Sequence, residues 1–591
     1  MTKPMIDMKK VIKSDLIISG GIVLGYARVI QPGDTKIPEI ILPASKISQE
    51  YTALDNAIKE TLLELKTLRD SAAQKIGSPV AKIFEAQLMI ASDAEFIKSV
   101  KKKIKSEKRN AGYIYNRLIN QSVIPLKRSN DEYLRQTAAD IEAVGSRIIS
   151  HLAGFDKCDL KFPPQTILIG KNFSPGDILS FRQRKAIGFL VSEGGRNSHM
   201  ALISRGLLLP VLLSKNIHLH VTDNSRIILD GLKGEIIINP TDNDWSEYQK
   251  LKKKQGSASV TRLHKLTEIP PQTADGKTIQ VGANLTLPGP VDEILSEKKF
   301  PVGLYRTEFM YLASGSFPTE EEQFVFYSEI ATQYRKSHVT LRTFDLGYDK
   351  LVEKDSWGQE DNPALGWRGI RPMLEMTDVF KTQIRAILRA SIHKNLKIML
   401  PMITDVVEID RAKKLIQQVK FSLKKEKIPF DEHIQLGIMI EVPSAALIAD
   451  LLATKVDFMS IGTNDLTQYT LAADRMNNKV TKLYSAFHPS VLKLIAMTVK
   501  AGKKHNVPVS ICGEIAGDLE ALPLFIGLGV DLLSMNPGKI FDLCRLVKKI
   551  DSEMAVHLTE TVLHCNKLEE VLMNLQNYKI ELEKKTISRR K

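Results

Sequence analysis

The stretch QLGIMIEVPSAALIADLLATKVDFMSIG, residues 435–462, holds two short apolar runs around a helix-like segment. The runs Gln435–Glu441 and Asp457–Gly462 have the length and apolar content of buried strands. Ala445–Leu452, which lies between them, has a helix-forming composition. A strand, a helix and a second strand in this order predict a parallel βαβ unit.

Six further apolar runs in the C-terminal half repeat this pattern, and helix-like sequence such as Thr382–Ser391 separates most of them. Eight strand-and-helix repeats favour a closed (β/α)8 barrel over an open sheet. The six runs are Thr278–Asn284, Pro301–Tyr305, His338–Arg342, Lys397–Met402, Val507–Cys512 and Leu528–Met535.

Active sites of this fold lie at the C-terminal ends of the strands. One or two polar residues there would be turn formers, but this sequence places a whole ring of them at the predicted strand ends, which favours a functional mouth. The ring consists of Arg306, Glu308, Arg342, Asp345, Pro401, Glu441, Asn464, Asp465, Cys512, Glu514 and Asn536.

The chemistry of this ring suits a metal ion and a phosphorylated substrate. Glu441 and Asp465 end consecutive strands, and their hard oxygens suit Mg²⁺; the alternative is a pair of acids neutralised by arginines. Four arginines near one mouth favour a phosphate group, because the planar guanidinium matches it. They are Arg306, Arg342, Arg368 and Arg475. Cys512 is either inert packing or, in such a mouth, an acid or nucleophile.

The N-terminal part predicts a small α/β domain interrupted by helices. Leu16–Ile30 resembles strands with turns, and apolar residues at three- and four-residue steps predict an all-helical block over about 32–153. Short β-like runs follow at Thr166–Ile169, Gly188–Val191, Arg226–Leu229 and Glu235–Ile238. Residues 241–268 are polar and show no core stripe, so we expect an exposed, partly helical connector.

The motif GGRNSHM, residues 194–200, follows one of these predicted strands. Its glycines permit a tight turn, and the next residues start a helix. His199 would then lie at a helix N-terminus, where free N–H groups favour phosphate. A lone histidine is often an exposed surface residue without a function. The motif therefore leaves two interpretations open, a phosphate-binding histidine and a histidine with no chemical role.

Composition and charge exclude several other classes of protein. The chain has 591 residues, 43% hydrophobic and 26% charged, with a net charge of +15. Its basic runs, Lys98–Arg109 and Lys584–Lys591, lack interleaved aromatic residues, so we expect solvated faces rather than a nucleic-acid site. Four cysteines without a C-x-x-C pair exclude a disulfide scaffold. We see no signal peptide and no apolar stretch of spanning length, and we expect a cytoplasmic protein without membrane insertion.

The chain resembles Enzyme I of the bacterial sugar phosphotransferase system, the phosphoenolpyruvate–protein phosphotransferases. The resemblance covers nearly the whole chain in order and includes the helical insertion. The motifs that carry it are GGRNSHMALISRG (194–206), VGLYRTEF (302–309), PTEEEQF (318–324), RTFDLGYDK (342–350), NPALGWRGIR (362–371), GIMIEVPSAA (437–446), FMSIGTNDLTQYTLAADR (458–475), CGEIAGD (512–518) and EYLRQTAADI (132–141).

The resemblance implies a role for each matched residue. His199 matches the phosphoryl acceptor, Glu441 and Asp465 match the magnesium ligands, and Cys512 matches the acid that protonates the enolate carbon. Asn464 and Asp465 match the substrate-binding pair. The matched phosphoenolpyruvate-binding residues are Arg306, Arg342 and Arg475, with Arg368 and Lys350 lining the same pocket.

The resemblance also implies an architecture and partners. It predicts a multidomain α/β protein with a swivelling phosphohistidine domain (1–31 and 154–240) and an inserted helical block (32–153) that docks the carrier protein HPr. A hinge (241–268) and the phosphoenolpyruvate-binding (β/α)8 barrel (269–591), which dimerises, follow. The expected reaction moves the phosphoryl group from phosphoenolpyruvate through His199 to HPr and releases pyruvate. There are two alternatives. One is a dikinase or synthase of the same superfamily, which needs an ATP-binding domain for which the chain has no room. The other is a scaffold without activity.

Overall fold

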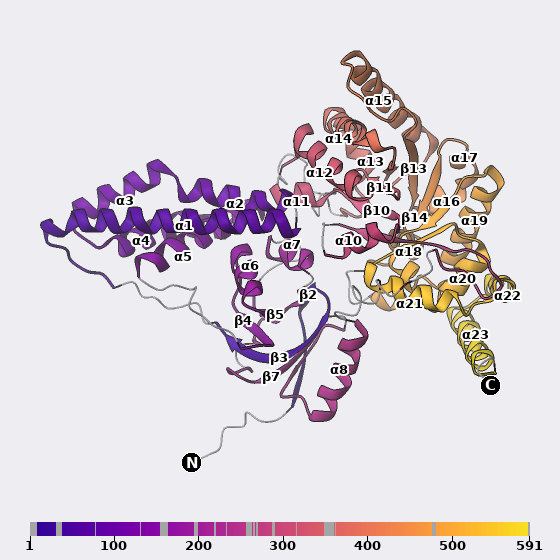
Figure 1. Ribbon diagram of the computed structural model, residues 1–591, viewed down its shortest axis with the longest axis horizontal. Helices are drawn as coiled ribbons and strands as arrows, with labels where there is room; N and C mark the ends of the chain where they lie inside the picture. The colour runs from indigo at the N-terminus through magenta and orange to yellow at the C-terminus, as the bar shows by residue number, and fades with distance from the viewer. Residues whose placement is uncertain are drawn as a thin grey trace.

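The computed structural model describes residues 9–30, 38–76, 78–129, 132–153, 163–193, 199–207, 209–217, 220–231, 233–255, 263, 266, 270–286, 290–314, 316–347, 360, 362–475 and 480–588. The statements below concern these residues. Figure 1 shows three parts: a long helical arm, a sheet with a few helices, and a barrel surrounded by helices.

The sheet is built from two separate segments of the chain. In its described part the strand order is β1-β8-β7-β3-β4-β5-β6-β2. The central strand β3 pairs in parallel with β4 and antiparallel with β7. The elements are β1 (Lys10–Lys13), β2 (Leu16–Ser19), β3 (Ile22–Val29), β4 (Thr166–Gly170), α6 (Pro175–Gln183), β5 (Ala186–Val191), α7 (His199–Gly206), β6 (Val211–Leu213), β7 (Arg226–Asp230), β8 (Glu235–Ile238) and α8 (Asp242–Gln255).

The helical arm lies between β3 and β4 in the sequence. Leu54, Ile58 and Leu65 of its first helix are buried, as the three- and four-residue spacing predicts. The arm's core is continuous with one face of the sheet through residues such as Phe189. The helices are α1 (Ile47–Ile76), α2 (Ser78–Ala91), α3 (Ala94–Glu107), α4 (Ala111–Arg128) and α5 (Glu132–Leu152), preceded by the 3₁₀ turn η1 (Ala44–Lys46).

The C-terminal part is the closed parallel barrel that the sequence predicts. Its strands run in the order β10-β11-β12-β13-β14-β15-β16-β9, each pair parallel. The strands are β9 (Gln280–Leu285), β10 (Val302–Arg306), β11 (Val339–Arg342), β12 (Leu396–Leu400), β13 (Gln435–Ile440), β14 (Phe458–Ile461), β15 (Val509–Ile511) and β16 (Leu532–Met535).

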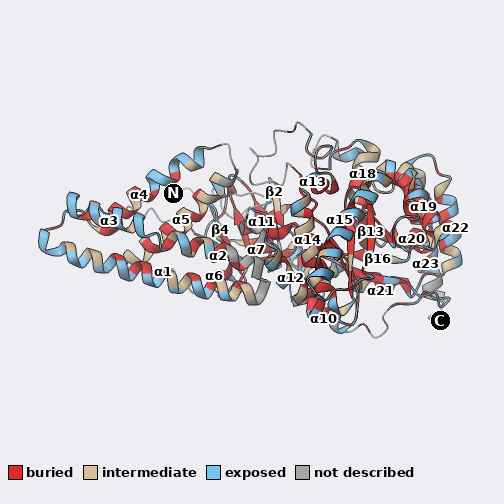
Figure 2. Ribbon diagram, turned by 90° about the horizontal axis from the view of Figure 1, so that it is seen from above, coloured by how far each residue is buried: buried red, intermediate tan, exposed pale blue. Residues whose placement is uncertain are grey.

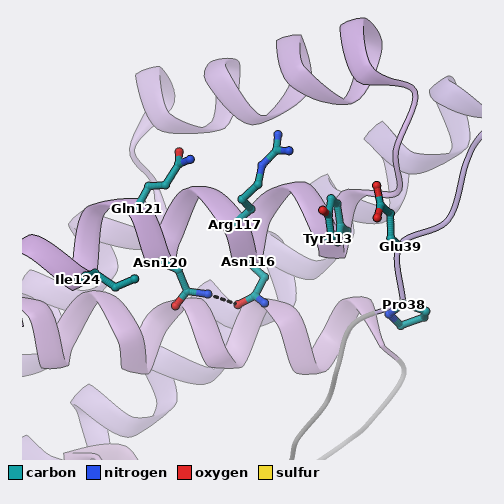
Figure 3. Close-up of a pocket in the computed structure, with 8 residues that line it drawn as sticks. All are labelled: Pro38, Glu39, Tyr113, Asn116, Arg117, Asn120, Gln121 and Ile124. Carbon is teal, nitrogen blue, oxygen red and sulfur yellow. Dashed lines mark hydrogen bonds between the residues drawn. The ribbon is translucent and has the colours of Figure 1, made fainter.

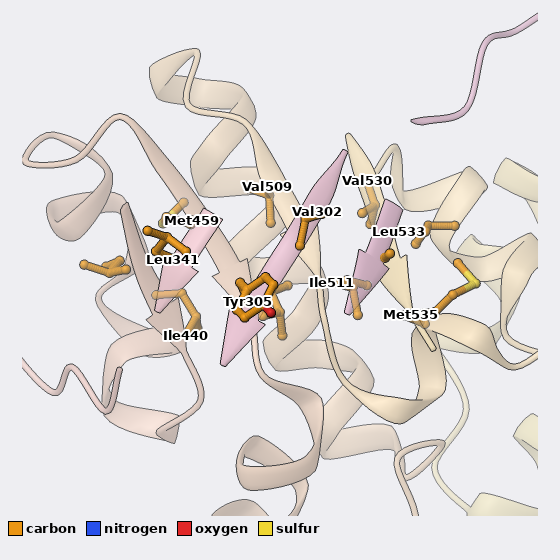
Figure 4. Packing of buried hydrophobic residues seen from close by; sticks show 14 of the residues in the cluster. Val302, Tyr305, Leu341, Ile440, Met459, Val509, Ile511, Val530, Leu533 and Met535 are labelled. Atoms are coloured by element: carbon orange, nitrogen blue, oxygen red, sulfur yellow. The ribbon is translucent and has the colours of Figure 1, made fainter. Parts of the chain in front are cut away.

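Helices cover the barrel and bury its apolar side chains, as Figures 2 and 4 show. Val302, Leu341 and Ile511, on three of its strands, are at most 1% exposed. The helices are α10 (Pro290–Glu297), α11 (Phe309–Ser314), α12 (Glu320–Gln333), α13 (Ile370–Glu375), α14 (Thr377–Ala390), α15 (Val406–Lys425), α16 (Pro443–Leu447), α17 (Ala449–Ala453), α18 (Thr463–Leu471), α19 (Pro489–His505), α20 (Leu522–Leu528), α21 (Pro537–Val547), α22 (Ser552–Leu563) and α23 (Leu568–Ser588).

The prediction of an exposed, partly helical connector over 241–268 is confirmed for the helix, but its premise that the segment has no core-facing side is wrong for the first half. Residues Asp242–Gln255 form α8, which packs on the sheet against β3. Tyr248 is only 6% exposed and, with Trp245 and Leu251, covers Ile22 and neighbouring sheet residues. Three apolar side chains spaced three residues apart suffice to bury one narrow face of an otherwise polar helix. Most of residues 256–269 lie outside the described residues, so the hinge stays a prediction.

The three parts meet at one junction. Helix α11, which directly follows β10 of the barrel, contacts both α2 of the arm and α7 of the sheet part, and α12 also contacts α2. Figures 1 and 2 both show α2, α7 and α11 side by side. The helix that begins at His199 therefore lies against a barrel helix whose preceding strand ends at Arg306.

Candidate functional site

The predicted ring of polar residues gathers at the carboxyl ends of the barrel strands. Arg306 and Arg342 are the last residues of β10 and β11, and Glu441 directly follows β13. Asp465 lies in the first turn of α18, just beyond β14, and Cys512 directly follows β15. Because all barrel strands are parallel, these ends open on the same side.

Two arginines and two acids form a buried ion cluster in this mouth. Arg342 is 6% exposed and forms an ion pair with Glu308, and its Nη1 lies 3.2 Å from Oδ2 of Asp345. Arg368 donates from Nη2 to the same Oδ2 at 2.9 Å. Burial alone would lower the pKa of Arg342, but Glu308 and Asp345 more than offset it, so the pKa is raised and the guanidinium stays charged.

The cluster extends to the predicted substrate residues of α18. Nη1 of Arg368 lies 3.6 Å from Oδ1 of Asp465 and donates to the hydroxyl of Tyr469 at 3.1 Å. Nη2 of Arg475 lies 4.0 Å from the same Asp465 oxygen. Asp465 and Tyr469 are four residues apart on α18, so they share one face of the helix. Both Arg368 and Arg475 thus border Asp465 from loops far apart in the sequence.

Glu441 is the most enclosed acid of the mouth. It is fully buried, and its Oε1 accepts the backbone N–H of Met402 at 2.7 Å. Met402 has a φ of 57°, an uncommon value for a non-glycine residue that turns its N–H toward the carboxylate. Burial, followed by the nearby charges of Asp465 and Asp345, raises the pKa of Glu441 to about 7.

Two carboxylate oxygens of the mouth have no hydrogen-bond donor among the residues that the structure describes. They are Oε2 of Glu441 and Oδ1 of Asp465, both inaccessible to solvent. A buried carboxylate oxygen without a donor is costly, and a divalent cation with oxygen ligands removes that cost. No group of three or more metal-ligating side chains occurs within the described residues, so a cation here would take its remaining ligands from substrate and water.

Arg306 differs from the other arginines because it lacks a counter-charge within 4 Å among the described residues. Its side chain keeps accessible surface in the mouth although protein atoms crowd around it. That desolvation, together with the charge of Arg342, lowers the pKa of Arg306, although a guanidinium stays protonated at neutral pH. It is therefore a cation available to an anionic ligand.

Cys512 faces the interior of the barrel. It is 3% exposed and packs with Leu304, Met399, Met439 and Phe458. Burial raises the pKa of its thiol to about 11, so the thiol is protonated at neutral pH. The charges of Glu441, Arg342 and Arg306 act on this thiol, which places it in the same mouth. A protonated thiol beside these groups can donate a proton to a bound anion.

The remaining predicted residues stand as follows. Asn464 lies in α18 and its Oδ1 accepts the N–H of Glu514 at 3.1 Å, which joins two strand-end loops. Lys350 lies outside the described residues. His199 begins α7, but its side chain and residues 194–198 also lie outside the described part.

Three contributors carry no site role in the sequence prediction. They are Met402, whose N–H binds Glu441, Tyr469, and Gln383, which donates to the hydroxyl of Thr307 at 3.1 Å. Tyr469 follows Asp465 by one helical turn, so helical spacing was a usable signal. Met402 and Gln383 act through backbone conformation and a long-range contact, for which the sequence offers no signal.

An open cavity of about 630 Å³ lies away from this mouth, on α4 of the helical arm (Figure 3). Its charged lining residues are already tied, since Arg117 pairs with Glu107 and Glu39 pairs with Arg109. Figure 3 also shows Asn120 donating to Asn116. Both charged residues of its lining thus have partners, whereas the barrel mouth brings together arginines and carboxylate oxygens that lack a donor among the described residues, so the mouth is the candidate site.

Three family models match this chain. Residues 260–552 match the PEP-binding domain of PEP-utilising enzymes, residues 16–136 match their N-terminal domain, and residues 162–234 match their mobile domain. None of the helices in the described residues is both long and apolar enough to cross a membrane.

Curated relatives match over almost their whole length. A protein of Listeria innocua named phosphoenolpyruvate-protein phosphotransferase is 36% identical over 565 residues, which covers 95% of this chain and 98% of the relative. A protein of the same name from Staphylococcus aureus is 35% identical and covers 97% of this chain and 100% of the relative. A solution structure titled Enzyme I (nEIt) is 31% identical and covers 41% of this chain and 98% of its own, with a TM-score of 0.35, too low to bear on the fold.

Proposed function

This chain belongs to the phosphoenolpyruvate–protein phosphotransferase family, and we propose that it passes the phosphoryl group of phosphoenolpyruvate through His199 to a histidine of the carrier protein HPr. The observation that carries the proposal is the barrel mouth, where arginines and two donor-free carboxylate oxygens converge. Such a mouth suits a small substrate that bears both a phosphate and a carboxylate.

The arginines bind and orient the substrate. Arg306 and Arg475 supply charge that the protein does not fully neutralise, and Arg342 and Arg368 supply N–H groups held in fixed directions. Asn464 and Lys350 complete the pocket in this proposal. Charge on the transferring phosphoryl oxygens is best stabilised by donors that are in place beforehand, since no reorganisation is then needed during the reaction.

Glu441 and Asp465 would hold Mg²⁺. The donor-free Glu441 Oε2 and Asp465 Oδ1 fit an ion that prefers oxygen ligands and takes one or two protein carboxylates. A bound Mg²⁺ would supply positive charge to the phosphoryl and enolate oxygens. A cation bound there would lower the pKa of Glu441 from its raised value of about 7, because positive charge favours the ionised carboxylate.

The proposed reaction has two chemical steps. A ring nitrogen of His199 attacks the phosphorus, the bond from phosphorus to the enol oxygen breaks, and its electron pair leaves with the enolate. The thiol of Cys512 then gives its proton to the methylene carbon, which yields pyruvate, and the thiolate regains a proton from solvent. The pKa of about 11 keeps the thiol protonated until an enolate is present.

Delivery of the phosphoryl group requires movement of the part that carries His199. Helix α7 contacts α11 beside the mouth, which supports transfer at this junction. To reach HPr, the histidine must then leave the barrel. We assign this swivelling to the segment that follows α8, and we keep 1–31 with 154–240, 32–153 and 269–591 as the proposed phosphohistidine, carrier-docking and barrel domains.

The helical arm is the proposed HPr-docking domain. It exposes large apolar side chains, such as Leu63 of α1 at 61% and Met89 of α2 at 70%. Helix α2 also contacts α7, so a partner on α2 would lie near His199. We further propose a homodimer formed through the barrel and a cytoplasmic location.

Acid-labile phosphate mapping tests the proposal. The purified full chain is incubated with Mg²⁺ and phosphoenolpyruvate carrying labelled phosphate, digested, and the labelled peptide is sequenced, with and without HPr. We expect acid-labile label on His199 that moves to HPr. Label from ATP would favour a dikinase or synthase, and the absence of pyruvate formation with HPr present would favour a scaffold.

A further inference from the structure

One buried carboxylate holds two of the arginines of the mouth. Oδ2 of Asp345 lies 3.2 Å from Nη1 of Arg342 and 2.9 Å from Nη2 of Arg368. Oδ1 of Asp345 also accepts from Nε of Arg368 at 3.2 Å, which makes that pair bidentate. Asp345 is 2% exposed, so solvent ions screen these contacts little.

Without this carboxylate the two guanidinium groups would repel each other. The mouth is enclosed by protein, and like charges interact strongly where the dielectric is low. Glu308 supplies a second negative charge, because it pairs with Arg342 and accepts the N–H of Asp345 at 3.1 Å. Two acids thus balance two arginines, and the cluster is neutral as a whole.

The backbone fixes the same geometry. Asp345 lies just after β11 and Arg368 just before α13, and between these two stems the N–H of Gly369 donates to the carbonyl of Leu346 at 3.1 Å. Gly369 has a φ of 66°, and a Cβ there would lie 2.6 Å from Cβ of Met402. The stems therefore have little freedom, and Asp345 meets Arg368 in one arrangement.

We propose that Asp345 is a positioning residue for phosphoryl transfer: it fixes the directions in which Arg342 and Arg368 present their guanidinium groups. This inference rests on the proposed function. Nε of Arg342 is inaccessible to solvent and has no hydrogen-bond partner in the described structure, so the Asp345 and Glu308 contacts set the orientation of this guanidinium. Arg368 turns its Nη1 toward Asp465 and Tyr469. Substrate then meets oriented donors, while net attraction comes chiefly from Arg306 and Arg475.

If Asp345 orients donors while other arginines attract the substrate, removing the Asp345 charge should slow turnover without weakening substrate binding. Asp345→Asn keeps the shape but adds one net positive charge to the mouth, so attraction for an anionic substrate increases. Arg342 and Arg368 also lose the carboxylate that pairs with both of them, so their guanidinium groups repel each other and move apart. The variant should therefore bind phosphoenolpyruvate at least as well as the parent but turn it over slowly.

The experiment measures pyruvate release with HPr and Mg²⁺, and phosphoenolpyruvate binding by calorimetry at several salt concentrations, for the full chain. For Asp345→Asn we expect kcat to fall between about tenfold and a hundredfold, with KM and the dissociation constant not raised and binding more sensitive to salt. Asp410→Asn, which removes an exposed acid of α15, is the matched control and should match the parent.

A double-mutant cycle with Arg368→Met separates positioning from direct action. If Asp345 acts through Arg368, adding Asp345→Asn to Arg368→Met should cost much less than it does alone. Equal losses in both backgrounds, or a raised KM with unchanged kcat, would overturn the inference. If Asp345→Asn fails to fold, Asp345→Glu replaces it: a lowered kcat at unchanged KM supports positioning, and parental kinetics refute it. Absence of pyruvate release by the parent itself would refute the proposed function instead.

Discussion

Replacing Gly462 with alanine gives a sharp test of the mouth, because it adds one methyl group beside the proposed metal ligand. Gly462 directly follows β14 with a φ of −85°, which alanine adopts without strain. The added Cβ would lie 2.6 Å from Oε2 of Glu441, 2.9 Å from Cβ of Glu441 and 2.8 Å from Cε of Met439. The substitution therefore acts on packing around Glu441 and not on backbone conformation.

The size of the effect follows from how little Glu441 can move. A relaxed carbon–oxygen contact needs about 3.3 Å, so Oε2 must retreat by roughly 0.7 Å. Glu441 is fully buried and Met402 holds its other oxygen, so the carboxylate cannot simply rotate into solvent. Overpacking of this kind costs about 1–3 kcal/mol of folding free energy, and a misplaced ligand lowers metal affinity about 10–100-fold.

The assay is Mn²⁺ binding followed by electron paramagnetic resonance, together with the Mg²⁺ dependence of pyruvate release. Gly517→Ala is the control, since its Cβ would lie 3.2 Å from Cβ and Cγ of Lys539 and 3.3 Å from Cβ of Met535, contacts that a small adjustment relieves. We expect Gly462→Ala to need about 10–100-fold more metal for half-maximal activity, whereas Gly517→Ala should not. Parental metal binding in a folded Gly462→Ala protein would refute the assignment of Glu441 as a ligand.

Four further outcomes can be checked. His199→Ala should abolish HPr phosphorylation but leave phosphoenolpyruvate binding to the barrel intact by calorimetry; equal loss of both would contradict the division between the two domains. Cys512→Ala should slow pyruvate release more than it weakens substrate binding, since it removes a protonated thiol with a pKa of about 11, and an unchanged rate speaks against an acid role. In the metal-free protein the contribution of Glu441 to stability should be complete below about pH 4.5 and should decline by up to about 3 kcal/mol as pH rises towards 7, because the folded state holds the Glu441 proton more tightly than the unfolded chain; thermal melts of Glu441→Gln should lack this decline, and an identical slope between pH 4.5 and 7 would contradict the raised pKa. Met89→Asp should raise the KM for HPr while phosphoenolpyruvate-dependent labelling of His199 stays parental, with Val407→Asp on the exposed barrel helix α15 as control; a parental KM for HPr would remove α2 from the docking surface.

The sequence predicts the barrel well because a parallel sheet buried on both faces needs continuous apolar strands. The runs Pro301–Tyr305, His338–Arg342 and Gln435–Glu441 show this pattern, and each predicted strand overlaps one of β9–β16. Once the strands are placed, their ends bring the polar ring together without any further information. The ring's membership was therefore accessible from spacing alone.

Other features depend on contacts that spacing does not encode. Arg368 pairs with Asp345, from which it is separated by 23 positions in the sequence, and Met402 presents its N–H to Glu441 from a left-handed conformation. Neither is a property of a local sequence pattern. The apolar positions of α8, among them Trp245 and Tyr248, were visible, but the surrounding charged residues favoured an exposed interpretation that the packing overrides.

The split sheet sets an order for folding during synthesis. Strand β3 ends at Val29, yet its parallel neighbour begins at Thr166 and its antiparallel neighbour at Arg226. The first three strands therefore stay without their sheet partners until the ribosome has added about two hundred more residues. Helices α1–α5 can form meanwhile from local contacts, which arise faster than distant ones. When the helical arm folds, it brings the segment that holds β1–β3 close to the segment that holds β4–β8. We expect the two sets of strands to pair in this way before their unpaired edges can bind another chain.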